Sequence, residues 1–180
     1  MRSSPSGNPI LTLHDILASI KLRDEDRLRL ADKLARWVLQ YYDTPWLRGL
    51  GAREIRFFTR HEDDTNYANW TPYISTSFTR TLPECRKSNN ELCALGSVLL
   101  QLGLNKLPDN FPDIDSEQNI KIAFHYLPRT LGMRYTRIVE KLLSEGAKGD
   151  RMEGEQIDNL TREITSKVDK ILGFYQNKSE

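Results

Sequence analysis

The segment from Leu92 to Leu104 constrains the fold more than any other part of this 180-residue chain. It is the longest apolar run in the sequence, interrupted by Gln101, and it is too short to span a bilayer as a helix. A helix that is apolar on nearly all sides belongs in the centre of a domain. Ser88 followed three residues later by Glu91 is a capping box. We therefore expect a central helix over 92–102 that Gly103 ends.

Two helices are predicted before this central segment. Thr12 and Asp15 form a capping box for a short helix, and Asp24 is placed to cap the next one. The stretch from Arg27 to Tyr42 has the i, i+3, i+4, i+7 spacing of an amphipathic helix, and Pro45 follows its end. The residues expected to face inward are Leu13, Ile16, Leu17, Ile20, Leu28, Ala31, Leu34, Ala35, Val38, Leu39 and Tyr42.

The second half of the chain is also predicted to be helical. One helix is expected over Ser116–Leu127, with Pro128 closing it, and another over Met133–Leu143. Gly146 and Gly149 indicate a polar break. A last helix carries an apolar stripe near the 3.5-residue period, formed by Ile157, Leu160, Ile164, Val168, Ile171 and Leu172.

Strand-like segments are few. Ile55–Phe58 is typical of a short strand, and Tyr73–Phe78 is expected to be extended. The fold class is therefore mainly α, with at most a small β element. The expected organisation is a disordered leader at 1–11, a helical domain at 12–146, a polar break at 147–154 and a C-terminal helix at 155–176 packed on the domain.

Composition narrows the functional classes. The 26 Lys and Arg residues nearly balance the 25 Asp and Glu residues, so the chain lacks the basic excess typical of a nucleic-acid binder. Two cysteines, Cys85 and Cys93, are too few for a disulfide framework and lack metal-ligand spacing. We expect a cytoplasmic protein that binds neither nucleic acid nor membrane, and the sequence leaves its oligomeric state open.

The order of these pieces resembles the C-terminal lobe of a protein kinase. The matching segments are Val38–Tyr42, Thr44–Leu47, Pro72–Ser75, Leu92–Leu102 and Gly132–Tyr135. In particular, they resemble the kinase-like domain of unknown function found at the C-terminal end of many fungal proteins, including ones with prion-inhibition-and-propagation or other incompatibility-type N-terminal domains. The resemblance covers roughly residues 12 to 172. This resemblance implies a kinase C-lobe-like helical domain with a role in fungal self/non-self recognition or stress signalling.

The resemblance also implies that phosphoryl transfer is lost. The kinase signature Asp-x-Trp-Ser-x-Gly corresponds here to Glu91, Cys93, Ala94 and Gly96, and only the glycine is retained. The region 44–58 lacks the His-Arg-Asp set, and no Asp-Phe-Gly motif or ATP-binding lobe is present. We therefore expect a non-catalytic protein-interaction or regulatory module, with no catalytic residues, no metal and no cofactor, that binds a protein partner or another domain.

Three residues are candidates for binding that partner. Trp46 lies where a kinase has its catalytic loop, and Arg48 and Arg53 follow it. The indole is interpreted either as an exposed anchor for a partner or as a filler of the cleft left by the missing catalytic residues. The two arginines either hold a carboxylate or phosphate or form ordinary surface pairs.

Two alternative functions stay open. His61 with Glu62, Asp63 and Asp64 offers ligands for a metal-dependent enzyme of unrecognised type, although four consecutive polar residues are also typical of a solvated loop. The stripe from Ile157 to Leu172 offers a helical dimerisation seam, or it packs on its own domain. His125, beside Phe124 and Tyr126, is interpreted as a helix-surface or core-edge residue.

Overall fold

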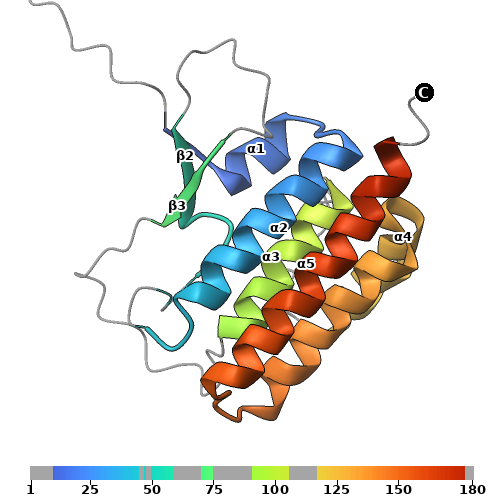
Figure 1. Ribbon diagram of the computed structural model, residues 1–180. Coiled ribbons are helices and arrows are strands. Elements are labelled where there is room, and N and C mark those ends of the chain that lie inside the picture. The colour runs from blue at the N-terminus through green and yellow to red at the C-terminus, as the bar shows by residue number, and fades with distance from the viewer. Residues whose placement is uncertain are drawn as a thin grey trace, which may run out of the picture.

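The fold is mainly helical with a small antiparallel sheet, which confirms the predicted fold class. The computed structural model describes residues 10–44, 47, 50–58, 70–74, 91–105 and 117–176. Within them lie five helices and three short strands. The four longer helices form the body of the molecule, and α1 (Leu13–Ser19) with the sheet lies against one side of it (Figure 1).

The body is a four-helix bundle in which neighbours run antiparallel. It consists of α2 (Asp24–Gln40), α3 (Glu91–Leu104), α4 (Glu117–Lys148) and α5 (Gly154–Gln176). Helix α2 contacts α3 and α5, and α4 contacts the same two helices from the other side (Figure 1). Up-and-down bundles of this kind bury one apolar stripe per helix around a shared core.

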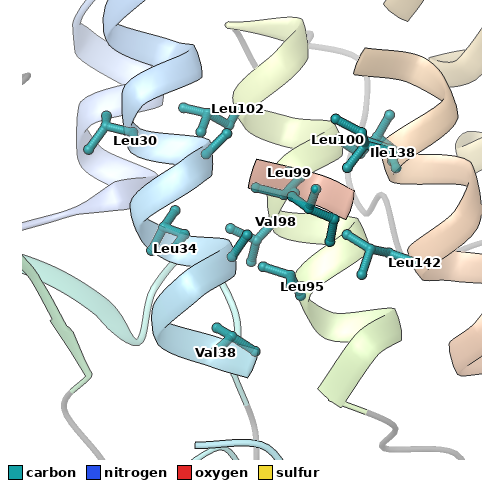
Figure 2. Packing of buried hydrophobic residues seen from close by; sticks show 14 of the residues in the cluster. Leu30, Leu34, Val38, Leu95, Val98, Leu99, Leu100, Leu102, Ile138 and Leu142 are labelled. Carbon is teal, nitrogen blue, oxygen red and sulfur yellow. The ribbon is translucent and has the colours of Figure 1, made fainter. Parts of the chain in front are cut away.

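Helix α3 supplies side chains to two sides of that core. Figure 2 shows Val98 and Leu102 facing α2, and Leu100 facing Ile138 of α4. This explains why the segment is apolar on nearly all sides, since both faces are covered. The fully buried hydrophobic side chains of α3 are those of Leu92, Leu95, Val98, Leu99, Leu100 and Leu102.

Glycines let α3 and α4 approach closely. A Cβ atom at Gly96 would lie 2.8 Å from Leu143, and one at Gly146 would lie 2.6 Å from the backbone nitrogen of Cys93. Gly103 was predicted to end α3, but the helix continues to Leu104. The missing side chain of Gly103 instead makes room for Leu127 and Tyr135 of α4. Asn105, with φ at 59°, takes the left-handed position that follows the helix.

Helix α4 turns sharply in its middle. Pro128 does not close a helix as predicted, since it lies inside α4. The break comes four residues later at Gly132, whose φ of 81° and ψ of 170° are not helical. We call this point the α4 bend. Gly146, expected in a polar break, lies within α4, and the break itself spans only 149–153, with Gly149 at φ 73°.

The N-terminal elements form a small unit beside α2. Strand β1 (Ile10–Thr12) pairs with β2 (Ile55–Phe58), which pairs with β3 (Pro72–Ile74), all antiparallel. The predicted capping box of Thr12 and Asp15 is confirmed. The leader expected at 1–11 is corrected at its end, because residues 10 and 11 belong to β1; residues 1–9 lie outside the described part, as do residues 75–78 of the second predicted strand.

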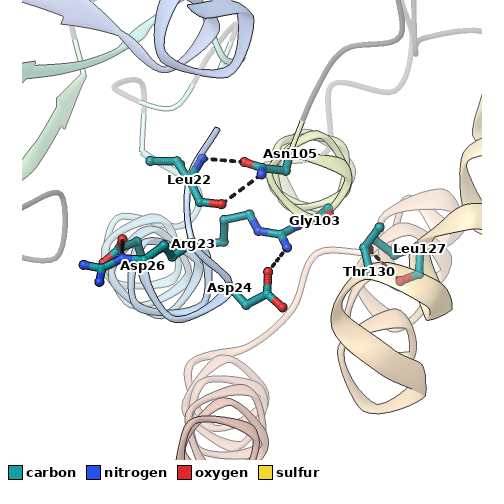
Figure 3. A network of polar contacts seen from close by, with 9 residues as sticks. Leu22, Arg23, Asp24, Asp26, Gly103, Asn105, Leu127 and Thr130 are labelled. Carbon is teal, nitrogen blue, oxygen red and sulfur yellow. Dashed lines mark hydrogen bonds and ion pairs between the residues drawn. The ribbon is translucent and has the colours of Figure 1, made fainter. Parts of the chain in front are cut away.

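Polar contacts join the start of α2 to the end of α3 (Figure 3). Asn105 accepts from the Leu22 backbone nitrogen at 3.0 Å and donates to its carbonyl at 2.9 Å. Buried Arg27 donates to the carbonyl of Gly103 at 2.6 Å and pairs with Asp24. Asp24, which was expected to cap α2, is instead the first residue of the helix and the ion-pair partner of Arg27. The N-cap is Arg23, whose side chain makes no capping hydrogen bond.

The apolar stripe of α5 packs inside the bundle. Ile157, Leu160, Ile164, Val168 and Ile171 are buried against α2 and α4. The stripe was predicted either to form a dimerisation seam or to pack on its own domain, and it packs on its own domain. A search of the described helices for one long and apolar enough to cross a membrane finds none.

Candidate functional site

The structure places only one of the three residues predicted to bind a partner. Arg53 lies exposed in the turn before β2, where its positive charge helps to lower the pKa of the Asp15 carboxyl. That pKa is lowered mainly by hydrogen bonds from the Thr12 side chain and backbone. Trp46 and Arg48 lie outside the described residues. Leu47, between them, is buried in the core.

Most of the candidate reactive residues also fall outside the described part. His61, Glu62, Asp63, Asp64 and Cys85 all do so.

Cys93 and His125 are described, and neither has a reactive setting. Burial raises the pKa of the half-buried Cys93 thiol, which donates to the Leu143 carbonyl at 3.6 Å, so the thiol stays protonated. His125 is exposed on α4 with its ring 5.6 Å from that of Tyr126, in agreement with the helix-surface interpretation. Among the described residues, no group of three or more His, Cys, Asp and Glu gathers where it could hold a metal ion.

A shallow polar groove runs between α2 and α5. Its volume is about 520 Å³, and Arg36, Arg162 and Lys170 line it together with three hydroxyl side chains and Asp169. Arg36 pairs with Asp32 at 2.8 Å. The groove is open, and its charged lining consists of three basic side chains and one carboxylate.

The more unusual feature is a group of exposed apolar side chains around the α4 bend. Met133 follows the bend directly and is 56% exposed, and Phe174 near the end of α5 is 58% exposed. Ile122 and Tyr126, 42% and 49% exposed, lie one turn apart on the segment before the bend. At about 1.5 Å per residue, Tyr126 lies only about 9 Å along the helix from Gly132.

Contacts around the bend explain why these side chains face solvent. Before the bend, α4 turns Ala123, Leu127 and Leu131 inward, and Ile122 and Tyr126 lie outside that stripe. After the bend, Tyr135 is fully buried, and its hydroxyl donates to the Leu99 carbonyl at 2.7 Å. Burial raises the pKa of this phenol, so it stays protonated as a donor.

An arginine links the two helices at this place. The guanidinium of Arg134 lies 5.0 Å from the centre of the Phe174 ring, which joins the end of α5 to the start of the second half of α4. Arg129 and Arg137 are exposed on the same helix, on either side of the bend. We call this set the bend surface; its members are Ile122, Tyr126, Arg129, Met133, Arg134, Arg137 and Phe174.

Sequence reasoning missed the bend surface. The sequence predicted one helix over Ser116–Leu127 and another over Met133–Leu143, but the large apolar residues outside their inward stripes were not considered. Ile122, Tyr126 and Met133 all lie outside those stripes. Phe174 was missed because the stripe of α5 was taken to end at Leu172. These residues can be found by taking the large apolar residues of each helix and leaving out those that belong to its buried stripe.

No protein family model, no curated protein and no solved structure matches this chain. The resemblance to a kinase C-lobe therefore stays a prediction, and the function is argued from the residues of the chain itself.

Proposed function

We propose that this protein is a non-catalytic protein-interaction or regulatory module derived from a kinase C-lobe, with a role in fungal self/non-self or stress signalling. The observation that carries the proposed binding role is the bend surface. Among the described residues, four large apolar side chains are more than 40% exposed: three lie on α4, on either side of its bend, and the fourth is Phe174, which Arg134 contacts from just after the bend. Exposed apolar groups that gather at one place mark interaction sites.

The composition of the bend surface supports protein binding. Tyr, Phe, Met and Arg are enriched at protein interfaces, and Tyr and Arg are frequent among the residues that dominate binding energy. The Arg134–Phe174 contact favours one arrangement of these two side chains, which reduces the entropy lost on binding. The bend also sets two short helical faces at an angle, a shape that a partner segment can follow.

The non-catalytic part of the proposal is tested with nucleotide. Thermal unfolding is measured with and without ATP and Mg²⁺, because a ligand that binds only the folded state raises the unfolding temperature by mass action. We expect no change. A clear rise with MgATP contradicts a module that has lost the nucleotide site.

The binding part is tested by comparing two variants in capture experiments from native extract. Wild-type protein is expected to retain a specific partner that the variant Tyr126→Ser/Met133→Ser/Phe174→Ser loses. Arg36→Gln/Arg162→Gln, which alters the groove between α2 and α5, is the control and should retain the partner. Binding is then repeated with the purified partner. Equal retention by all three proteins contradicts a binding role for the bend surface.

A further inference from the structure

The sequence of α4 around the bend is one-sided in charge, although the chain as a whole is nearly neutral. From Gln118 to Val139 the sequence contains no Asp or Glu, whereas it contains Lys121, Arg129, Arg134 and Arg137. The whole chain has 26 basic and 25 acidic residues. The local excess therefore arises because acidic residues are missing from this one segment.

In the part of the chain that the structure describes, the arginines of the bend surface form no ion pair with a carboxylate. Other basic side chains of the bundle form ion pairs, as Lys141 does with Glu163 across α4 and α5 and Arg151 does with Asp43. Within the described residues, Arg129, Arg134 and Arg137 pair with no carboxylate, and Arg134 instead covers the Phe174 ring. These guanidiniums keep their donors available for a ligand.

The exposed apolar side chains and the arginine donors together indicate the chemical class of ligand that this surface binds. Resting on the proposed function, we propose that the bend surface docks an acidic amphipathic segment of a partner protein. The apolar face of that segment covers Ile122, Tyr126, Met133 and Phe174, and its Asp or Glu side chains reach the flanking arginines. A guanidinium binds a carboxylate through two parallel hydrogen bonds, which fixes orientation as well as adding attraction.

An anionic lipid surface is the other ligand with apolar and negative groups. A helix that lies on such a surface presents a continuous apolar face along its length. Here Gly132 breaks α4 between Tyr126 and Met133, and the apolar group is completed by a side chain from a different helix. This arrangement suits a segment that contacts two elements at once, and the experiment below includes vesicles as a separate arm.

The test uses two fluorescent 18-residue peptides with the full-length protein. Both carry Leu and Phe at i, i+3, i+4 and i+7; one has Glu at the flanking positions and the other has Gln at the same positions. Binding is measured by anisotropy at 50 and 300 mM NaCl. We expect the Glu peptide to bind at least tenfold more tightly than the Gln peptide at low salt, with the difference shrinking at high salt.

Matched variants show which arginines are responsible. Arg129→Gln/Arg137→Gln removes two charges from the bend surface and leaves Arg134 on Phe174, so we expect it to weaken binding of the Glu peptide about tenfold. Arg36→Gln/Arg162→Gln removes the same charge elsewhere and should leave binding unchanged. Circular dichroism and thermal unfolding of each variant confirm that both remain folded.

Each other outcome overturns the inference in a distinct way. Equal binding of both peptides, lost in Tyr126→Ser/Met133→Ser/Phe174→Ser, removes the acidic partner but keeps the proposed binding function. Binding of neither peptide removes the docking site for this class of ligand, and the capture experiment then decides the function by itself. Arginine-dependent binding to phosphatidylserine vesicles without peptide binding assigns the surface to a membrane instead.

Discussion

The inner and outer sides of α4 both carry large apolar side chains, but only the inner side is buried. On the inner side, Leu127 and Tyr135 lie against Gly103 of α3, and Leu143 lies against Gly96. On the outer side, Tyr126 and Met133 face solvent. Burial of apolar area stabilises the fold, so the inner residues are explained by folding alone. The outer residues gain little from folding, which points to binding.

The largest expected effect comes from filling the inner contact. Gly146→Ala places a Cβ atom 2.6 Å from the backbone of Cys93, which cannot move as a side chain can. We expect the free energy of unfolding to fall by about 2 kcal/mol despite the better helix propensity of Ala. Chemical denaturation measures the change.

Gly173→Ala is the matched control for this substitution. Nothing lies within 4 Å of a Cβ atom at Gly173 in α5, so the same change should stabilise the protein by up to about 1 kcal/mol. Equal effects at both positions would contradict the close approach of α3 and α4.

Two tyrosines of α4 give the next comparison. Tyr135→Phe removes a buried hydroxyl that donates to the Leu99 carbonyl, and we expect a loss of about 1 kcal/mol in unfolding free energy. Tyr126→Phe on the outer side should change stability by less than about 0.3 kcal/mol, because its surroundings are solvated. If Tyr126→Phe cost as much as Tyr135→Phe, the outer tyrosine would belong to the folded core.

Polar substitution of the outer residues should separate stability from binding. We expect Tyr126→Ser/Met133→Ser to alter the unfolding free energy by less than about 1 kcal/mol, since both side chains are about half exposed. Binding of the acidic peptide should nevertheless be lost. A variant that unfolds at room temperature would show that these residues serve the fold.

The smallest effect concerns the paired charges between α4 and α5. Hydrogen bonds from Lys141 and then Lys167 lower the pKa of Glu163 below its ordinary 4.5. The stabilisation is therefore complete above pH 4.5 and is lost as pH falls through the lower folded-state pKa. Wild-type protein should be slightly more stable than Glu163→Gln at pH 7, and the difference should vanish in acid. A difference that grows on acidification would contradict this pairing.

The sequence predicted a helix or strand correctly where one local sequence pattern was sufficient to define it. Ile55–Phe58 forms β2 as expected, and the capping box of Thr12 and Asp15 begins α1. Ile10–Thr12 was missed as a strand because three residues carry no periodicity, and only pairing with β2 defines them.

Errors at glycine and proline have a common physical cause. Gly103 was taken as a helix end and Gly146 as part of a polar break, yet both lie inside helices, where α3 and α4 approach closely. Pro128 was taken as a stop, whereas the bend occurs at Gly132, which adopts a positive φ. Local propensity describes what a residue permits, and tertiary packing decides whether the chain uses it.

The candidate site was not predictable by the same route. Motif reasoning directed attention to Trp46, Arg48 and Arg53, of which only the exposed Arg53 lies in the described part. The bend surface combines residues from α4 and from Phe174 of α5, and sequence spacing gives no information about such a contact. The absence of acidic residues from Gln118 to Val139 was visible in the sequence, but it gained meaning only beside exposed apolar side chains.

The central claim is that the outer side of the α4 bend binds a partner segment. It is tested most directly by recording amide NMR shifts of the isotope-labelled protein during titration with the Glu peptide. We predict that the shifts gather at residues 122–137 and near Phe174 and leave the turn at Arg53 unchanged. Shifts that gather around Arg53 or along the groove between α2 and α5, or no shifts at all, would contradict the claim.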